Sequence, residues 1–385
     1  MTIPRSLFSA DHEMFRDSVR RFIETELVPH HAQWEEDGIV PRDVWPKAGA
    51  AGLLCCNISE AYGGPGTDFL FNVVVIEELA RAGITGPGFA VHSDMVATYI
   101  ERFGSEELKK KWLPGMVSGE VVGSLGLTEP DAGSDLRGIR TTARREGDEY
   151  VISGQKTYIS NGQTSDVIVV ATKSDPERPR DAITLILVET DRPGFSRGRN
   201  LKKLGLHAQD TSELFFDNVR VPVSNIIGEE HQGFKCLTQN LAQERLVQAV
   251  RSCVVAEVTI QQTVEYTAGR KAFGKTIADF QNTQFKLAEL QAQTVAGRVF
   301  VDRCIELQLQ GKLDPVVAAI AKLQLTELHC KVVDECLQLY GGWGYMWEFP
   351  VCRAYADARI VKIAGGAVEV MKQIISRDLF KGTRA

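Results

Sequence analysis

The segment from Gly126 to Gly138, GLTEPDAGSDLRG, combines small residues with hydroxyl and acidic side chains. Glycine and alanine allow a ligand to approach the backbone amides closely, and the hydroxyls of Thr128 and Ser134 can bind a polar group. The same letters are typical of an N-capped turn, because TEPD and GSD are common turn sequences. The residues alone leave both interpretations open, a ligand-binding loop and a structural turn.

A second segment, GRKAFGKT from Gly269 to Thr276, fits the phosphate-loop pattern G-x-x-x-x-G-K-[ST] and raises the hypothesis of an ATPase or kinase. A phosphate loop follows a buried strand and opens a helix, whereas the preceding AEVTIQQTVEYTA has the pattern of an amphipathic helix. We therefore interpret the segment as a basic connection between helices, where Arg270 could still bind an anion. Loss of ATP binding in Lys275→Ala would instead support the NTPase.

A third segment, QLYGGWGYMWEFPVCRAYAD from Gln338 to Asp357, surrounds two glycines with aromatic residues. Gly341 and Gly342 permit a sharp turn and a close approach of another group to the backbone. The pattern is equally typical of a helix C-cap followed by an apolar contact. No strand precedes it, so it is not a dinucleotide fingerprint.

The elements that must position these segments follow a helix, sheet, helix order. Apolar residues recur at helical spacing from Asp11 to about Ser118, with Ser9 or Asp11 as the first cap. Short β-rich runs then begin at Val167, Ile183 and Leu214, and from Gly233 helical patterns return, including Val247 to Thr267 and Gln284 to Leu309. GGWG is expected to separate the last two helices. This organisation predicts an α+β protein with domains at 1–119, 120–230 and 231–385.

Composition excludes several classes of function. The 385 residues carry a net charge of -6, so no global basic field would hold a nucleic acid. The eight cysteines show no C-x-x-C spacing, which favours buried thiols in a reducing compartment. The sequence contains no apolar run long enough for a membrane span and no h-region near Met1. We expect a cytoplasmic protein without a membrane span or a metal site.

Taken together, the three segments resemble signatures of the acyl-CoA dehydrogenase family, and the resemblance covers nearly the whole chain. KLGLHAQDTSELFFDNVRVP, Lys203 to Pro222, is similar to the family's return from the β domain into the helices. The resemblance implies an N-terminal helical domain, a middle β-barrel or sandwich-like domain and a C-terminal four-helix bundle. It also implies FAD between the last two domains, and a homotetramer built as a dimer of dimers in which the neighbouring subunit grips the dinucleotide tail.

The resemblance assigns the cofactor contacts residue by residue. Three groups of residues are expected around the flavin ring: Leu125, Thr128, Gly133 and Ser134 on one side, Tyr158, Ile159 and Ser160 on the other, and Ala367 and Glu369 nearby. The dinucleotide tail is expected to meet Arg270, Phe273 and Gln281 across the dimer interface, together with Gln338, Gly341 and Gly342.

The catalytic base departs from the commoner family pattern. Many members carry Tyr and Glu where IAGGAVEV, Ile363 to Val370, has Ala364 and Gly365, and glycine cannot abstract a proton. A minority supply the base from an earlier helix, and NLAQERL, Asn240 to Leu246, resembles the long-chain version. We therefore expect Glu244 to be the base, with Glu369 as the alternative. For an arbitrary glutamate, a solvated helix carboxylate would be the ordinary interpretation.

The reaction implied is α,β-dehydrogenation of an acyl-CoA thioester. Glu244 would take the α-proton while the β-hydrogen leaves as hydride to flavin N5, which gives a trans-2-enoyl-CoA and a reduced flavin for an electron-transfer flavoprotein. The N–H of Gly365 would stabilise the enolate oxygen, with Ser134, Arg245, Ala364 and Gly366 beside the substrate. Small residues at 364 and 365 leave room for a long-chain, branched or isoprenoid acyl group such as citronellyl. A flavin oxidase or monooxygenase of the same fold, and an inactive scaffold subunit, are the alternatives.

Overall fold

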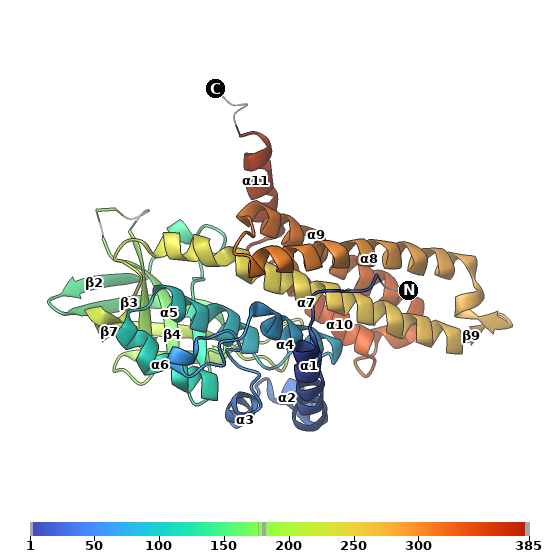
Figure 1. Cartoon of the computed structure of the whole chain (residues 1–385), viewed down its shortest axis with the longest axis horizontal. Helices are drawn as coiled ribbons and strands as arrows, with labels where there is room; N and C mark the ends of the chain where they lie inside the picture. Colours follow the sequence, from blue (N-terminus) through green and yellow to red (C-terminus); the bar gives the residue numbers. More distant parts are fainter. Residues whose placement is uncertain (1–2, 176, 179–181, 382–385) are drawn as a thin grey trace.

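A computed structural model describes residues 3–175, 177–178 and 182–381 of the chain, and Figure 1 shows their arrangement. Helices form the first part. They are α1 (Ala10–Phe22), α2 (Val28–Asp37), α3 (Val44–Ala50), α4 (Phe69–Arg81), α5 (Thr98–Phe103) and α6 (Glu106–Ser118), with π-helical turns η1 (Ile23–Leu27) and η3 (Val91–Ala97) and a 3-10 turn η2 (Glu60–Tyr62).

The first helix confirms the apolar pattern. Ser9, rather than Asp11, is the N-cap of α1. Val19, Ile23 and Leu27 are buried, because the π turn η1 continues α1 without a break and keeps the apolar stripe facing the core.

The middle part is a sheet of eight strands. The strands are β1 (Gly123–Gly126), β2 (Thr142–Glu146), β3 (Glu149–Ser160), β4 (Val167–Lys173), β5 (Ile183–Glu189), β6 (Phe195–Asn200), β7 (Thr211–Pro222) and β8 (Ile226–Ile227), with 3-10 turns η4 (Leu136–Gly138) and η5 (Val223–Asn225). Their order is β6-β7-β3-β2-β4-β5-β8, and β1 pairs with β4 in parallel, Gly123 opposite Val167. The three predicted β-rich runs are therefore confirmed as β4, β5 and the greater part of β7.

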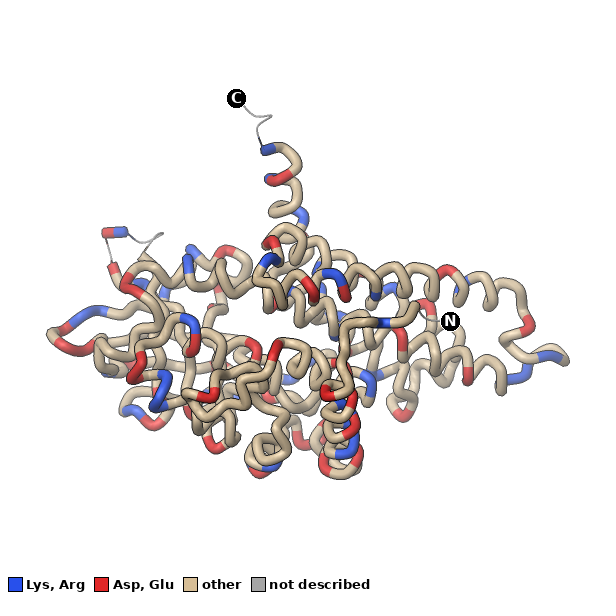
Figure 2. The backbone as a smooth tube through the Cα atoms, in the orientation of Figure 1, with Lys and Arg blue, Asp and Glu red and all other residues tan. Residues whose placement is uncertain are grey.

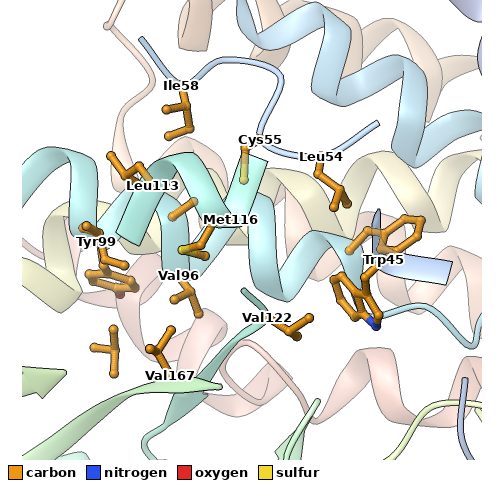
Figure 3. Packing of buried hydrophobic residues seen from close by; sticks show 14 of the residues in the cluster. Trp45, Leu54, Cys55, Ile58, Val96, Tyr99, Leu113, Met116, Val122 and Val167 are labelled. Carbon is orange, nitrogen blue, oxygen red and sulfur yellow. The ribbon is translucent and has the colours of Figure 1, made fainter. Parts of the chain in front are cut away.

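Strands β4 and β5 are buried on both faces, which explains their continuous apolar sequences. On one face Val167 and Val169 join the cluster that contains Trp45, Tyr99 and the other helical residues of the first part (Figure 3). On the other face Ile168 and Val170 pack inside the β domain. The sheet is thereby fixed against the N-terminal helices, with β1 and the loop after it at their junction.

The last part contains three long helices, α7 (Gly233–Gly269), α8 (Gln281–Leu309) and α9 (Pro315–Tyr340), followed by α10 (Pro350–Ala358) and α11 (Val368–Leu379). Short turns η6 (Ile277–Asp279), η7 (Gly341–Tyr345) and η8 (Arg359–Lys362) connect them, together with the two-stranded β9 (Lys271–Ala272) and β10 (Lys275–Thr276). In Figure 1, α7 runs from beside the β domain to the end of the molecule that carries β9, and α11 projects away from α9.

The expectation that GGWG separates the last two helices is wrong, because two helices, α10 and α11, follow it. The GGWG segment forms η7, after which Pro350 begins α10. The second interruption is made by Gly365 and Gly366, which have φ angles of +65° and +91°. Glycine adopts this left-handed region at little cost, so the backbone turns there and α11 begins as a separate helix.

A buried charge cluster joins the first and last parts of the chain. Glu77 of α4 has no exposed surface and contacts Arg5 at 2.9 Å, Arg16 at 3.1 Å and Arg298 of α8 at 2.9 Å. We call Arg5, Arg16, Glu77 and Arg298 the Glu77 cluster. Elsewhere, as Figure 2 shows, positive and negative residues are dispersed over the described chain. None of the described helices is long and apolar enough to cross a membrane; the cytoplasm stays a prediction.

Candidate active site

The loop after β1 is anchored by a buried ion pair. Lys156 of β3 has 1% of its surface exposed, and its ammonium donates to Glu129 Oε1 at 2.7 Å and to the carbonyl of Leu127 at 3.2 Å. Glu129 also accepts the N–H groups of Arg140 and Thr141. The ion pair and these bonds hold the TEPD segment against the sheet.

Burial and the ion pair have opposite effects on the pKa values of Glu129 and Lys156. Burial raises the pKa of Glu129, but the charge of Lys156 and the donated hydrogen bonds outweigh it, so the pKa lies below its ordinary value. Burial lowers the pKa of Lys156 to about 8, against the attraction of Glu129. The pair is ionised near neutral pH and fixes one conformation of the loop.

The anchored loop presents the residues expected to contact the flavin. Leu125 and Thr128 are half-buried, whereas Gly133 and Ser134 are exposed. The carbonyl of Thr128 accepts the N–H of Thr157 at 2.9 Å. That bond brings the Gly126 to Gly138 segment beside the end of β3, where the second group of expected flavin contacts lies.

Tyr158, in that second group, has a strained and open conformation. Its φ is +61°, and its side chain is 67% exposed, while Ile159 is buried and Ser160 half-buried. The pairing of β3 with β7 is irregular between Lys156 and Ile159, which lets the backbone turn the ring outward. A left-handed, exposed tyrosine next to the loop is suited to stack on a flat ligand.

Glu244 is a buried carboxylate on α7 with 4% of its surface exposed. The hydroxyl of Tyr99 donates to its Oε1 at 2.8 Å, and Asn240 Nδ2 donates to the same oxygen at 3.1 Å. Burial raises the pKa of Glu244, and these two bonds and the charge of Arg245 lower it only in part. A raised pKa matches a carboxylate to the abstraction of a weakly acidic proton.

The Gly365–Gly366 turn lies one helical turn from Glu244 on the same side of α7. A side chain at Gly365 would lie 3.7 Å from Gln248, four residues after Glu244. The Gly365 N–H donates no hydrogen bond within the described chain, so it is available to a ligand oxygen. Ala364 is half-buried next to it.

Two cations lie behind this turn. Lys322 of α9 is buried and donates to the carbonyl of Gly366 at 2.6 Å, and burial lowers its pKa to about 8. Arg245 is also buried, with its Nη1 3.4 Å from the Pro315 carbonyl and no partner for its Nε among the described residues. Lys322 therefore fixes the turn, and Arg245 keeps one donor unused.

Glu369, the alternative base, is in a different setting. It is the second residue of α11 and is exposed, and Ala367 is the N-cap of that helix. Its carboxylate is open to solvent, whereas that of Glu244 is buried. The structure thus favours Glu244.

A surface pocket of about 650 Å³ brings two of the sequence segments together. Arg270 lines it with Gln338, Gly341 and Gly342, although about 70 residues separate Arg270 from the others. Beneath it the rings of Tyr266 and Tyr340 stack at 3.9 Å. The pocket offers one guanidinium, one amide and open backbone, a combination suited to a phosphate-containing ligand.

The GRKAFGKT segment is a hairpin, not a phosphate loop. Strands β9 and β10 pair within it, and helices, α7 and α8, lie on both sides. The interpretation as a connection between helices is confirmed. Phe273, with φ +50°, is 95% exposed at its tip, and Gln281 is exposed where α8 begins. These two residues do not line the pocket in the single chain.

Three residues of the site are absent from the sequence-based expectations: Tyr99, Lys156 and Lys322. Tyr99 reaches the site from α5, which holds no expected site residue. Lys322 lies on α9, remote from Gln338 near the end of that helix. Lys156, in contrast, lies on β3, two residues before Tyr158. The one available signal is a lysine within an apolar pattern, as in AAIAKLQL around Lys322.

The comparisons with known proteins match the chain from end to end. Three family models cover it: the acyl-CoA dehydrogenase N-terminal domain at residues 9–120, the middle domain at 124–219 and the C-terminal domain at 231–380. The long-chain specific acyl-CoA dehydrogenase of Sus scrofa mitochondria is 47% identical over 97% of this chain and 88% of its own length.

Solved structures agree. The acyl-CoA dehydrogenase of Geobacillus kaustophilus is 46% identical, with a TM-score of 0.96 over 98% of this chain and 100% of the other. A glutaryl-CoA dehydrogenase from Mycobacterium smegmatis in complex with FADH2 is 31% identical, with a TM-score of 0.90 over 98% and 96%. With the buried carboxylate, the anchored loop and the three matching domains, this chain belongs to the acyl-CoA dehydrogenase family, whose members are FAD enzymes.

Proposed function

We propose that this protein is an acyl-CoA dehydrogenase that introduces a trans-2 double bond into an acyl-CoA thioester, with Glu244 as the base. The observation that carries the assignment is the buried carboxylate with a raised pKa next to the Gly365 turn. Among the described residues no donor reaches its Oε2, which is left to accept the α-proton. The Gly365 N–H is free to bind the thioester oxygen, which stabilises the developing enolate.

The residues around the site fit FAD. The loop with Leu125, Thr128, Gly133 and Ser134 would hold the ring, with Tyr158, Ile159 and Ser160 on its other side, because the Thr157–Thr128 bond places the two segments together. The pocket with Arg270 and Gln338 would hold the dinucleotide tail of the neighbouring copy's FAD, and its guanidinium would pair with the pyrophosphate. When bound, FAD supplies the acceptor for the hydride that leaves the β-carbon.

For the substrate, we propose a long-chain or branched acyl group. Ala364 carries only a methyl group and Gly365 no side chain, and a Cβ at Gly365 would make one ordinary contact, with Gln248 at 3.7 Å. The two residues therefore take up less volume beside the turn than the Tyr and Glu of the commoner family pattern. The name of the pig relative, long-chain specific acyl-CoA dehydrogenase, supports the long-chain choice. A branched isoprenoid chain such as citronellyl fits the same argument from volume, and activity must decide between them.

For the partners, we propose an electron-transfer flavoprotein as electron acceptor and a homotetramer as the assembly. Phe273, at the tip of the β9–β10 hairpin, is an exposed aromatic residue that another copy would cover. With Arg270 beside it, the hairpin would bring a positive charge to the neighbouring copy's FAD. Light scattering of the purified protein, expected to give the mass of four chains, measures this assembly.

The test of the function is anaerobic bleaching of the bound flavin by palmitoyl-, isovaleryl- and citronellyl-CoA. The wild type is expected to bleach rapidly with one of them, whereas Glu244→Gln retains its flavin and bleaches at least about a thousandfold more slowly, because an amide cannot take the proton. Glu369→Gln tests the alternative base, and Glu306→Gln, which removes a surface carboxylate on α8, is the matched control that should bleach at the wild-type rate.

The outcomes separate the alternatives. Normal bleaching in Glu244→Gln with its loss in Glu369→Gln would move the base to Glu369. No bleaching of the wild type by any thioester would overturn the dehydrogenase. Steady peroxide formation in air, with no transfer to an artificial acceptor under nitrogen, would indicate an oxidase instead.

A further inference from the structure

Both hydrogen bonds to Glu244 converge on one oxygen and come from two different helices. Tyr99 belongs to α5 in the first part of the chain, and Asn240 lies one turn before Glu244 on α7. Their donors reach Oε1 at 2.8 and 3.1 Å. A carboxylate held in this way can neither rotate freely nor exchange the roles of its two oxygens.

The orientation of Asn240 is itself determined. Arg102 of α5 donates to Asn240 Oδ1 at 3.1 Å and to Gln243 Oε1 at 2.9 Å. Because Arg102 has only donors, the amide oxygen of Asn240 must face it, and the NH₂ group must face Glu244. The chain of bonds therefore runs in one direction, from Arg102 through Asn240 to the carboxylate.

Tyr99 is equally fixed, but by packing. Its side chain is fully buried in the large N-terminal cluster, near Val96 and Val167 (Figure 3). The ring of Phe103 lies 6.2 Å away in a tilted arrangement. Packing on its apolar sides already holds the ring of Tyr99 in one orientation. Its hydroxyl therefore binds Glu244 without a further loss of side-chain entropy during the reaction.

We propose that Tyr99 and Asn240 are positioning residues that pin Oε1 of Glu244, so that Oε2 alone receives the substrate proton. The proposal rests on the assignment of Glu244 as the base and deepens it. Because both donors bind the ionised form, they also keep the base ready at a lower pH than burial alone would permit. Neither residue needs to touch the substrate.

The other charged and titratable groups near Glu244 do not hold its carboxylate in place, so this role falls to Tyr99 and Asn240. From α7 itself, Arg245 lowers the pKa of Glu244. Asp94 of η3 is engaged by Asn72 at 2.7 Å, and Lys322 of α9 by the Gly366 carbonyl. Arg102 of α5 acts through Asn240. The causes of the Glu244 pKa shift are therefore burial, Tyr99, Asn240 and Arg245.

The experiment measures the pH dependence of kcat/KM in the holoenzyme for wild type, Tyr99→Phe and Asn240→Ala. Loss of one donor should raise the pKa of Glu244, so the acid limb should move up by about one pH unit. Activity below the limb should fall about tenfold, with recovery toward the wild-type rate at high pH. Asn240→Ala keeps the test open if Tyr99→Phe does not fold.

Tyr62→Phe is the matched control. The Tyr62 hydroxyl also donates to a carboxylate, Glu106, at 2.9 Å, but on the surface. Its removal should leave the acid limb in place. A second readout does not depend on turnover: infrared difference spectra follow the protonated carboxyl band of Glu244, identified by its absence in Glu244→Gln, as the pH changes.

The possible results distinguish the pinning of Oε1 from the assignment of Glu244 as the base. An upward shift of both the acid limb and the infrared titration in either variant supports the proposal. Unchanged titration in both folded variants overturns it, even if Glu244→Gln is inactive. A shifted infrared titration combined with full activity of Glu244→Gln would overturn the assignment of the base and leave the pinning of Oε1 intact.

Discussion

At the scale of single residues, the site contains buried ionisable groups whose desolvation penalty is offset by a charged or hydrogen-bonding partner. Lys156 and Glu129 are both buried, and each would carry a large desolvation penalty alone. Glu244 differs, because its hydrogen-bond donors are neutral and no cation in the described part of the chain forms an ion pair with it. The paired residues hold the loop, whereas the unpaired one keeps a raised pKa that suits proton abstraction.

Replacement of Glu129 by Gln should lower the free energy of unfolding strongly at neutral pH and only slightly in acid. Gln leaves the Lys156 charge buried without its partner, which costs about 3–5 kcal/mol of unfolding free energy. The pKa of Glu129 lies below its ordinary value of 4.5, so its contribution is present above that pH and is lost as the pH falls through the folded-state value. The difference between wild type and variant in urea unfolding should therefore shrink below pH 4.5. A constant difference across this range would contradict the ion-pair argument.

At the scale of elements, the turn before α11 determines where the free N–H of Gly365 points. Gly365 and Gly366 both have positive φ, and Lys322 holds the Gly366 carbonyl. The turn belongs to no helix or strand, so its geometry depends on glycine and on one buried ammonium. A substitution that changes the backbone conformation of this turn should lower kcat more than it lowers the free energy of unfolding.

Gly366→Ala tests this directly, with Gly311→Ala as the matched control. Gly311 has φ +66° and open space around it, and it lies at the end of α8. Both variants should lose about 1–2 kcal/mol of unfolding free energy from left-handed strain. Only Gly366→Ala should also lose activity, at least about tenfold in kcat, because relief of its strain at φ +91° would move the turn that directs the Gly365 N–H. The contact of the new methyl with Met371 Cε at 2.8 Å is relieved by that flexible side chain. Equal activity in the two variants would refute the assigned role of the turn.

At the scale of the whole molecule, the surroundings of Glu244 depend on separate parts of the chain that are fixed against one another. Tyr99 reaches Glu244 across 145 positions of sequence, and the Glu77 cluster joins the N-terminal segment, α1, α4 and α8. The Tyr99 bond can keep its geometry only if α5 and α7 do not move apart. The Glu77 cluster fixes the first part of the chain to α8 at another place, so both parts are held together by more than one polar contact.

Glu77→Gln should destabilise the whole chain by about 3–5 kcal/mol, because the buried guanidinium groups of Arg16 and Arg298 and the partly exposed one of Arg5 lose their common counter-charge. The measurement is urea unfolding followed by tryptophan fluorescence. The control on α8 is Arg303→Ala, which removes an exposed pair with Glu306 and should change stability by no more than about 0.5 kcal/mol. Similar effects of the two variants would mean that burial does not distinguish these charges.

How much the sequence predicted depends on the range of the interactions involved. Apolar periodicity is local, so it predicted the helices of the first part and the strands β4 and β5. It could not separate α10 from α11, because the apolar pattern continues from Val351 to Val361 and the break comes from the backbone angles of Gly365 and Gly366.

The sequence by itself determined the family and the order of the domains, because those depend on which residues stand in a motif. The residues missing from a motif made Glu244 the proposed base, which the bleaching experiment has still to test. Tertiary structure decided what surrounds them. Tyr99, Lys156 and Lys322 come to the site by long-range packing, and the pKa of Glu244 depends on burial, a property of the folded chain that no local pattern records.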